Sequence, residues 1–171
     1  MDSNDLNRRV RYALSLDDAD VIDLFRLVSY TADIAQISAW RIKEGNDGYL
    51  PCPPDALSAM LSGLIIQRRG VREEATPGSD SGVAATGAEG APPKPSIVAL
   101  DNNAVLKQIR IALSLKTDEV HELIQLGGGK LGKSEVNALF RKPAARNYRR
   151  CGDQVLRWFL SGLAKRRESE Q

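Results

Sequence analysis

The sequence has little of what many enzymes and secreted proteins depend on. Its 171 residues include one histidine and two cysteines, and aromatic residues make up 5%. Two cysteines in a chain of this size do not make a disulfide framework, so we expect a reduced protein in the cytoplasm. The scarcity of aromatic residues disfavours a β-sandwich and suits small helical units.

Long apolar runs are also missing. The longest, over residues 61–66, is interrupted by Ser62 and Gly63 and is too short to span a membrane. The first ten residues, MDSNDLNRRV, lack the apolar core of a signal peptide. We therefore expect no membrane partner.

Metal-binding and catalytic patterns are equally scarce. A metal site or a catalytic triad at His121 would need partner residues that the sequence does not supply. The acidic run from Asp17 to Asp23 is interpreted as a capped helix start, because a calcium loop would need a bend-forming glycine. Cys52 and Cys151 are interpreted as small buried residues, with a redox-sensing pair as the alternative. We expect no cofactor, no metal and no enzymatic activity.

The chain does contain an internal repeat with an offset of 99 residues. RYALSL at 11–16 returns as RIALSL at 110–115, and Tyr49-x-x-Cys52 returns as Tyr148-x-x-Cys151. Such self-similarity indicates two copies of one structural unit. We predict a first helical repeat at 1–70 and a second at 100–168. Between them we predict a flexible linker at 71–99, whose Gly/Ala/Pro-rich composition cannot offset the entropy of ordering.

Each repeat is predicted to form four helices. Asn4 and Asn103 are predicted to cap the first helix of each repeat, and the second helix is predicted to open at Asp17–Asp18 or Thr117–Asp118. No stretch alternates as a strand. The predicted fold class is all-α, with two tandem four-helix repeats related by a pseudo-twofold axis. The apolar residues that recur at helical spacing in the first helices are Leu6, Val10, Leu14, Val105, Ile109 and Leu113.

One stretch, Gly127 to Ser134, fits the pattern G-x-x-x-x-G-K-[ST] of phosphate-binding loops in nucleotide hydrolases. The repeat argues against that function, because the equivalent residues 28–35 read VSYTADIA and contain no glycine. The motif also lies between two predicted helices, whereas a phosphate loop follows a strand. We predict a Gly-rich turn with Ser134 near the cap of the third helix. A nucleotide-dependent enzyme is the less favoured alternative.

Basic charge gathers in the second repeat. Residues 1–70 hold eight Lys/Arg and ten Asp/Glu, whereas residues 100–171 hold fourteen and eight. The second and third predicted helices resemble a helix-turn-helix, with Ser134, Asn137 and Arg141 opposite Val136 and Leu139. Cations around this face would neutralise phosphates. The predicted nucleic-acid interface consists of Lys130, Lys133, Ser134, Asn137, Arg141, Lys142, Arg146, Arg149 and Arg150.

Two functions follow from these patterns. The favoured one is a non-enzymatic, regulatory or nucleic-acid-associated protein that binds DNA or RNA through the basic second repeat. The alternative is an adaptor that binds a protein partner through the near-neutral first repeat and has no affinity for nucleic acid. Charge runs and helix pairs with polar faces also occur in helical proteins that bind no nucleic acid. The pattern favours no particular oligomeric state.

Several longer motifs resemble a known family. They are RYALSLDD at 11–18, SAW at 38–40, YLPC at 49–52, SGLIIQRRG at 62–70, FRKP at 140–143, YRRC at 148–151 and FLSGL at 159–163. Together they resemble the YehS-like bacterial proteins, a family of unknown function. The resemblance covers both repeats and implies a cytoplasmic bacterial protein with a duplicated helical fold. It implies no activity and no catalytic residues. The long linker departs from the shorter connection expected of this family.

Overall fold

A computed structural model describes residues 1–70 and 100–170, and the predicted linker at 71–99 lies outside these residues. The described residues form eight helices and no strand, which confirms the all-α prediction. The helices of the first repeat are α1 (Ser3–Leu14), α2 (Asp18–Leu27), α3 (Ile34–Ala39) and α4 (Pro54–Arg69). Those of the second repeat are α5 (Asn102–Ala112), α6 (Thr117–Leu126), α7 (Lys133–Leu139) and α8 (Asp153–Ser169). None of these eight has the length and apolar character that crossing a bilayer requires.

The first helix of each repeat is capped by an aspartate. Asp2 accepts a hydrogen bond from the backbone N–H of Asp5 at 2.7 Å, and Asp101 accepts one from Ala104 at 2.7 Å. The prediction that asparagines cap these helices was therefore wrong. Each asparagine lies two residues after the aspartate, inside the first turn, where its side chain is free to reach other parts of the chain.

The second helices begin where the sequence predicted. Asp17 accepts the N–H of Asp20 at 2.8 Å and caps α2, which confirms that the acidic run is a capped helix start. In the second repeat α6 begins at Thr117, and Glu119 closes its first turn by accepting the N–H of Lys116 at 2.7 Å. Acidic residues at these positions also suit the positive end of the helix dipole.

Asn4 and Asn103 join the first helix of each repeat to the loop before the fourth. The Asn4 amide donates to the carbonyls of Trp40 at 3.0 Å and Leu50 at 2.8 Å, and its oxygen accepts the N–H of Cys52 at 2.8 Å. Asn103 makes the same three contacts in the second repeat. Its partners there are the carbonyl of Leu139 at 2.7 Å, the carbonyl of Arg149 at 3.0 Å and the N–H of Cys151 at 2.8 Å.

Glycine lets the second and fourth helices of each repeat approach closely. A Cβ atom on Gly63 would lie 2.2 Å from the carbonyl oxygen of Leu24, and one on Gly162 would lie 1.8 Å from that of Leu123. No side chain fits at such distances. The Leu-Ser-Gly-Leu sequence that both repeats contain is therefore the place where α4 crosses α2 and α8 crosses α6.

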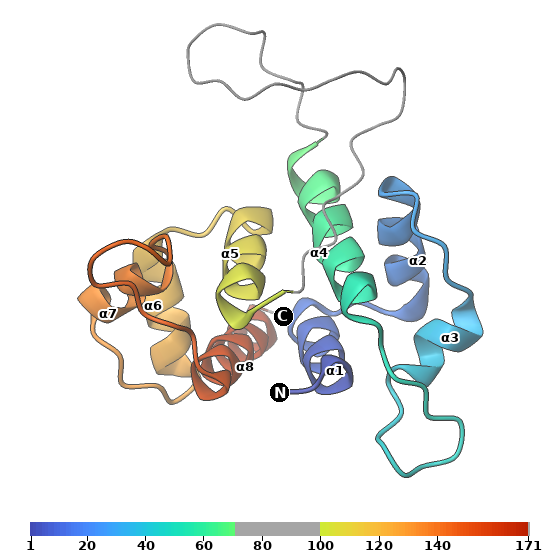
Figure 1. The fold of residues 1–171 in the computed structure, drawn as a ribbon. Coiled ribbons are helices and arrows are strands. Elements are labelled where there is room, and N and C mark those ends of the chain that lie inside the picture. The colour runs from blue at the N-terminus through green and yellow to red at the C-terminus, as the bar shows by residue number, and fades with distance from the viewer. Residues whose placement is uncertain (71–99, 171) are drawn as a thin grey trace, which may run out of the picture.

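The two repeats pack by a reciprocal exchange of helix contacts. Helix α1 lies mainly against α8 of the other repeat, and α5 lies mainly against α4 (Figure 1). Contacts of α1 with α4, and of α5 with α8, within one repeat are few. Such reciprocity is what a pseudo-twofold relation requires, and it agrees with the prediction.

A single hydrophobic core runs through both repeats. It is built as predicted from the apolar faces of α1 and α5: Val10, Val105 and Ile109 are fully buried, whereas Leu14 and Leu113 lie half-buried at its margin. Because residues of both repeats fill this core, the first and fourth helices cover each other's apolar faces across the repeat boundary. Flanking pairs α2–α3 and α6–α7 occupy the two ends of the molecule (Figure 1).

Candidate functional site

The nine residues of the predicted nucleic-acid interface all lie exposed on α7 and on the two loops beside it. Val136 and Leu139 are buried as predicted, and Phe140 packs half-buried against the core. Ser134 and Asn137 are exposed on the outer side of α7. The local sequence therefore separates an apolar inner side from a polar outer side. We refer to these nine residues as the basic surface.

Three of its seven cations are held by neighbouring groups. Lys133 pairs with Asp118 at 2.9 Å, and this contact holds the pKa of Asp118 below its ordinary value. Arg149 pairs with Glu135, whose pKa is lowered by the N–H of Gly132 and then by this arginine. The third, Arg141, donates to the carbonyl oxygen of residue 146 at 2.8 Å. These contacts order α7 and the loop that follows it.

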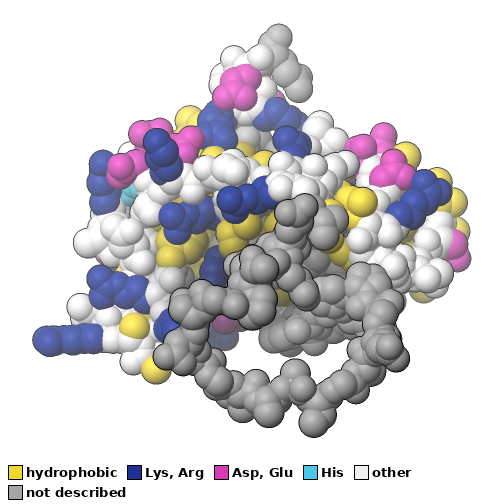
Figure 2. Space-filling view, turned by 90° about the horizontal axis from the view of Figure 1, so that it is seen from above, with side chains coloured by type: hydrophobic (Ala, Val, Ile, Leu, Met, Phe, Trp, Pro, Cys, Tyr) yellow, Lys and Arg dark blue, Asp and Glu magenta, His cyan; other side chains and the backbone are white. Residues whose placement is uncertain are grey.

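The other four cations are free to meet an external anion. Lys130, Lys142, Arg146 and Arg150 have no carboxylate within 4 Å among residues 1–70 and 100–170. On the face seen in Figure 2, Lys and Arg side chains are denser over the side of α5–α8, at the left, than over the side of α2. Exposed cations without carboxylate partners attract polyanions and release counterions when they bind them.

The equivalent stretch of the first repeat has a different charge. Residues 130–150 contain seven Lys/Arg and one acidic residue, whereas residues 31–51 contain two Lys/Arg and three acidic residues. The two stretches occupy matching places in a duplicated fold. A basic surface is therefore not something that the fold requires at this place.

Three of the four glycines in the phosphate-loop pattern, Gly127, Gly128 and Gly129, have structural reasons to be glycine. Gly127 ends α6, and a Cβ atom there would lie 1.9 Å from the carbonyl oxygen of Trp158 in α8. Gly128 has a φ of +98°, which favours glycine. The stretch is the turn between α6 and α7 that the sequence predicted, and Ser134 is the second residue of α7.

The histidine and the two cysteines of the chain lie in places typical of residues with a structural role. His121 lies half-buried with its Nε2 2.9 Å from the carbonyl oxygen of Leu131. Cys52 and Cys151 are free and buried, as the favoured interpretation predicted, and burial raises the pKa of each thiol to about 12. A thiol with such a pKa is a poor nucleophile and a poor redox sensor. Within the described ranges no group of three His, Cys, Asp or Glu side chains is placed to hold a metal ion.

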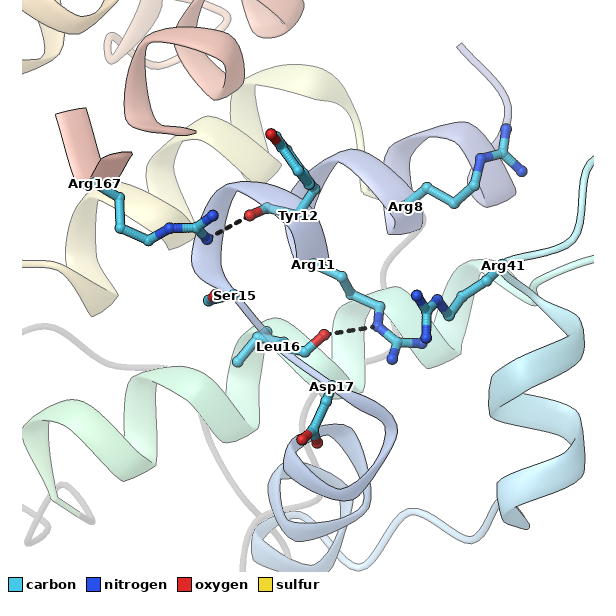
Figure 3. A pocket seen from close by; sticks show the side chains of 8 residues that line it. All are labelled: Arg8, Arg11, Tyr12, Ser15, Leu16, Asp17, Arg41 and Arg167. Carbon is cyan, nitrogen blue, oxygen red and sulfur yellow. Dashed lines mark hydrogen bonds between the residues drawn. The ribbon is translucent and has the colours of Figure 1, made fainter. Parts of the chain in front are cut away.

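A cavity lies where α8 of the second repeat meets the turn between α1 and α2. Its volume is about 550 Å³, and Figure 3 shows the eight side chains that line it. We refer to it as the arginine cavity, because half of its lining residues are arginines: Arg8, Arg11, Arg41 and Arg167.

Arg11 is the buried member of this group. Its side chain is 3% exposed, donates to the carbonyls of Leu16 and Ile37 at 3.4 Å each, and pairs with Asp18. Burial raises the pKa of Asp18, but hydrogen bonds from Ser38 and Arg11 lower it further, so that it lies below its ordinary value. The carboxylate therefore stays charged and holds Arg11 in place.

The arginine cavity could be predicted only in part from the sequence. Arg8, Arg11, Tyr12 and Ser15 have the spacing of one helix side, which is a readable signal. Arg167 is distant in sequence, and its donation to the carbonyl of Tyr12 depends on the packing of α8 against α1. That packing crosses the repeat boundary, and the sequence does not reveal it.

A known family and a known protein resemble this chain in both repeats. A family described as "Protein of unknown function (DUF1456)" matches residues 3–70 and 102–168, one segment in each repeat. An uncharacterized protein, YehS of Escherichia coli (strain K12), is 38% identical over 164 residues, which cover 96% of this chain and 95% of the relative. These matches confirm the YehS-like resemblance. No solved structure matches the chain.

Proposed function

We propose that this chain, which belongs to the DUF1456 family, binds nucleic acid through the basic surface of its second repeat. The description of that family assigns it no activity. The proposal assigns the chain a binding role without catalysis. It rests on one observation: residues 130–150 contain seven Lys/Arg side chains and one acidic side chain. Four of these seven cations have no carboxylate partner in the described structure.

The shape of this region supports the proposal. Helix α7 is short, follows α6 after a turn, and turns Ser134 and Asn137 outward. In helix-turn-helix proteins the second helix of such a pair enters the major groove, where amide and hydroxyl groups contact base edges. The basic loop at 141–150 then contributes phosphate contacts, which position the protein on the duplex without reading its sequence.

The experiment that tests the proposal is fluorescence anisotropy with labelled random duplex DNA and with single-stranded RNA. Each is titrated at two salt concentrations against the wild type and against a triple variant, Lys142→Ala, Arg146→Ala and Arg150→Ala. We expect binding that weakens steeply with salt in the wild type. For every cation that touches a phosphate, its removal should lower the slope of log K against log salt by about 1.

A matched control carries the same loss of charge on the first repeat. Arg26→Ala, Lys43→Ala and Arg68→Ala also remove three exposed cations. This variant should bind as the wild type does, because its surface has no excess of cations. Equal weakening in both triple variants would show attraction to net charge alone and would contradict the proposal. Absence of binding by the wild type even at low salt would contradict the proposal and favour the alternative, an adaptor that binds a protein partner.

A further inference from the structure

The arginine cavity has a smaller counterpart in the second repeat. Arg110 takes the place of Arg11 and donates to the carbonyl of Leu115 at 3.0 Å. Arg69 of α4 reaches the carbonyl of Ile111 at 3.5 Å, as an arginine of α8 does in the first repeat. The counterpart has a volume of about 280 Å³ and is lined by these two arginines together with Ile111, Ser114 and Leu115. Of the contacts common to both cavities, those of Arg11 and Arg110 lie within one repeat, and those of Arg167 and Arg69 join the two repeats. Both kinds are structural.

The two other arginines are particular to the larger cavity. The position equivalent to Arg8 is Lys107, which does not line the counterpart. The position equivalent to Arg41 is Phe140, whose ring centroid lies 4.4 Å from the guanidinium carbon of Arg110. The fold therefore forms this junction without arginine at either position, and their presence in the first repeat calls for another reason.

Both of these guanidinium groups keep free donors. The Arg41 side chain is 56% exposed, and its nearest carboxylate oxygen, on Asp18, is 3.6 Å away, too far for a hydrogen bond. Arg8 donates to the carbonyl of Ile42 at 3.3 Å and lies 3.7 Å from Asp5. A guanidinium group has five N–H donors, so most of the donors of both side chains remain available to a ligand.

The carboxylates near the cavity are already engaged. Asp17 lines it but accepts the N–H of Asp20 as a helix cap, and Asp18 accepts from Arg11 and Ser38. Four guanidinium groups thus line this opening together with one carboxylate, that of Asp17, so the lining carries an excess of positive charge. In Figure 3 the guanidinium groups of Arg11 and Arg41 lie close together, Arg167 extends from α8 to the carbonyl of Tyr12, and Arg8 extends from α1 at the right.

One aromatic ring stands beside these cations. Tyr12 is 62% exposed and lines both the arginine cavity and an adjoining one of about 270 Å³. The guanidinium carbon of Arg167 lies 5.7 Å from its ring centroid. An exposed ring between two hollows offers a stacking surface for a planar group.

We propose that the arginine cavity binds the phosphate groups of a small molecule, with Arg8 and Arg41 as the principal contacts. Guanidinium groups bind phosphate oxygens through paired, charge-assisted hydrogen bonds. The volume falls within the range of about 300–1,000 Å³ that is usual for small-molecule sites. Two sources fit: a nucleotide, with its base against Tyr12, or a free polyphosphate. The site is separate from the basic surface and does not depend on the proposed function.

Isothermal titration calorimetry at low ionic strength tests the proposal, with the full chain and with pyrophosphate and ADP as probes. We expect pyrophosphate to bind with a Kd below about 1 mM. The double variant Arg8→Ala/Arg41→Ala should weaken both probes at least about tenfold, since it removes the main partners of their phosphate groups. Arg41→Glu tests the same site with one exposed substitution, and far-UV circular dichroism verifies that each variant is folded.

Two controls separate the site from other causes. Arg69→Ala removes the matching arginine of the counterpart, and the triple variant of the basic surface removes cations elsewhere. Both should bind pyrophosphate as the wild type does. If ADP binds more tightly than pyrophosphate, and Tyr12→Ala weakens the binding of ADP alone, the ligand of the cavity is a nucleotide. If both probes bind with equal affinity, the ligand is a free polyphosphate. No binding by the wild type, or binding unchanged in the folded double variant, would overturn the proposal.

Discussion

At the scale of single residues, Asn4 and Asn103 each connect three distant parts of their repeat through hydrogen bonds to backbone groups. Asn4 is buried and ties α1 to the end of α3 and to the loop before α4 through three backbone hydrogen bonds. The sequence pattern suggested a helix cap, because asparagine near a helix start is a common cap. An aspartate two positions earlier fills that role equally well, and only the tertiary fold shows which side chain does so.

Replacing Asn4 by alanine should lower the free energy of unfolding by about 3 kcal/mol, because it leaves buried backbone groups without partners. Replacing the half-buried Asn103 by alanine should lower the free energy of unfolding by less, about 1–2 kcal/mol, since water can reach its backbone partners. Urea denaturation followed by circular dichroism measures both. Asn137→Ala is the control, and its exposed side chain predicts a change below about 0.5 kcal/mol. Equal effects at all three positions would contradict this account.

The ion pair of Asp18 with Arg11 gives stability that depends on pH. The pKa of Asp18 is lower in the folded state, so its contribution is present above about pH 4, the pKa of an unfolded aspartate, and declines as the pH falls below that value. Asp18→Asn should therefore destabilise the protein by about 2 kcal/mol at pH 7, since the buried Arg11 loses its counter-charge. Near pH 3 the difference should shrink. Urea melts at both pH values test this, and a constant difference would contradict it.

At the scale of helices, the close crossings of α4 with α2 and of α8 with α6 determine how each repeat packs. The sequence could predict the eight helices and the Gly-rich turn from periodicity, caps and the repeat. It could also predict that the nine residues of the basic surface would be exposed. It could not show why glycine follows serine in both fourth helices, because that reason lies in the backbone of a different helix.

Gly63→Ala and Gly162→Ala should each destabilise the protein by on the order of 3 kcal/mol, because the added methyl group forces two helices apart. Thermal denaturation measures the effect. Gly152→Ser is the matched control, since a side chain there meets nothing within 4 Å and serine is favoured at the start of a helix. If the control were equally unstable, glycine flexibility rather than the close approach would be the cause.

The shared core determines how the whole molecule should unfold. Each repeat contains one tryptophan, Trp40 or Trp158, so Trp40→Phe and Trp158→Phe each leave one reporter. Because α1 packs on α8 and α5 packs on α4, we expect one cooperative transition. In both variants, fluorescence and circular dichroism should give the same urea midpoint. Two separate steps would show repeats that fold independently.

The pairing of helices between the two repeats could not be predicted from the sequence. An offset of 99 residues is compatible with helices that pack within a repeat and with helices that pack between repeats, since both keep the same apolar faces buried. The arginine cavity depends on that choice, because Arg167 reaches Tyr12, in the last turn of α1, from the other repeat. The basic surface, which lies within one repeat, does not.

The reciprocal packing of first and fourth helices has a consequence for any chain of half this length. A single repeat would leave the apolar sides of its own first and fourth helices without their main partners. Two copies could supply those partners to each other, so the half-length chain would reach this architecture as a homodimer. Its folding would then depend on concentration. Joining both copies in one polypeptide replaces that dependence with a fixed effective concentration, and it frees each copy to acquire residues that a symmetric dimer would have to carry twice.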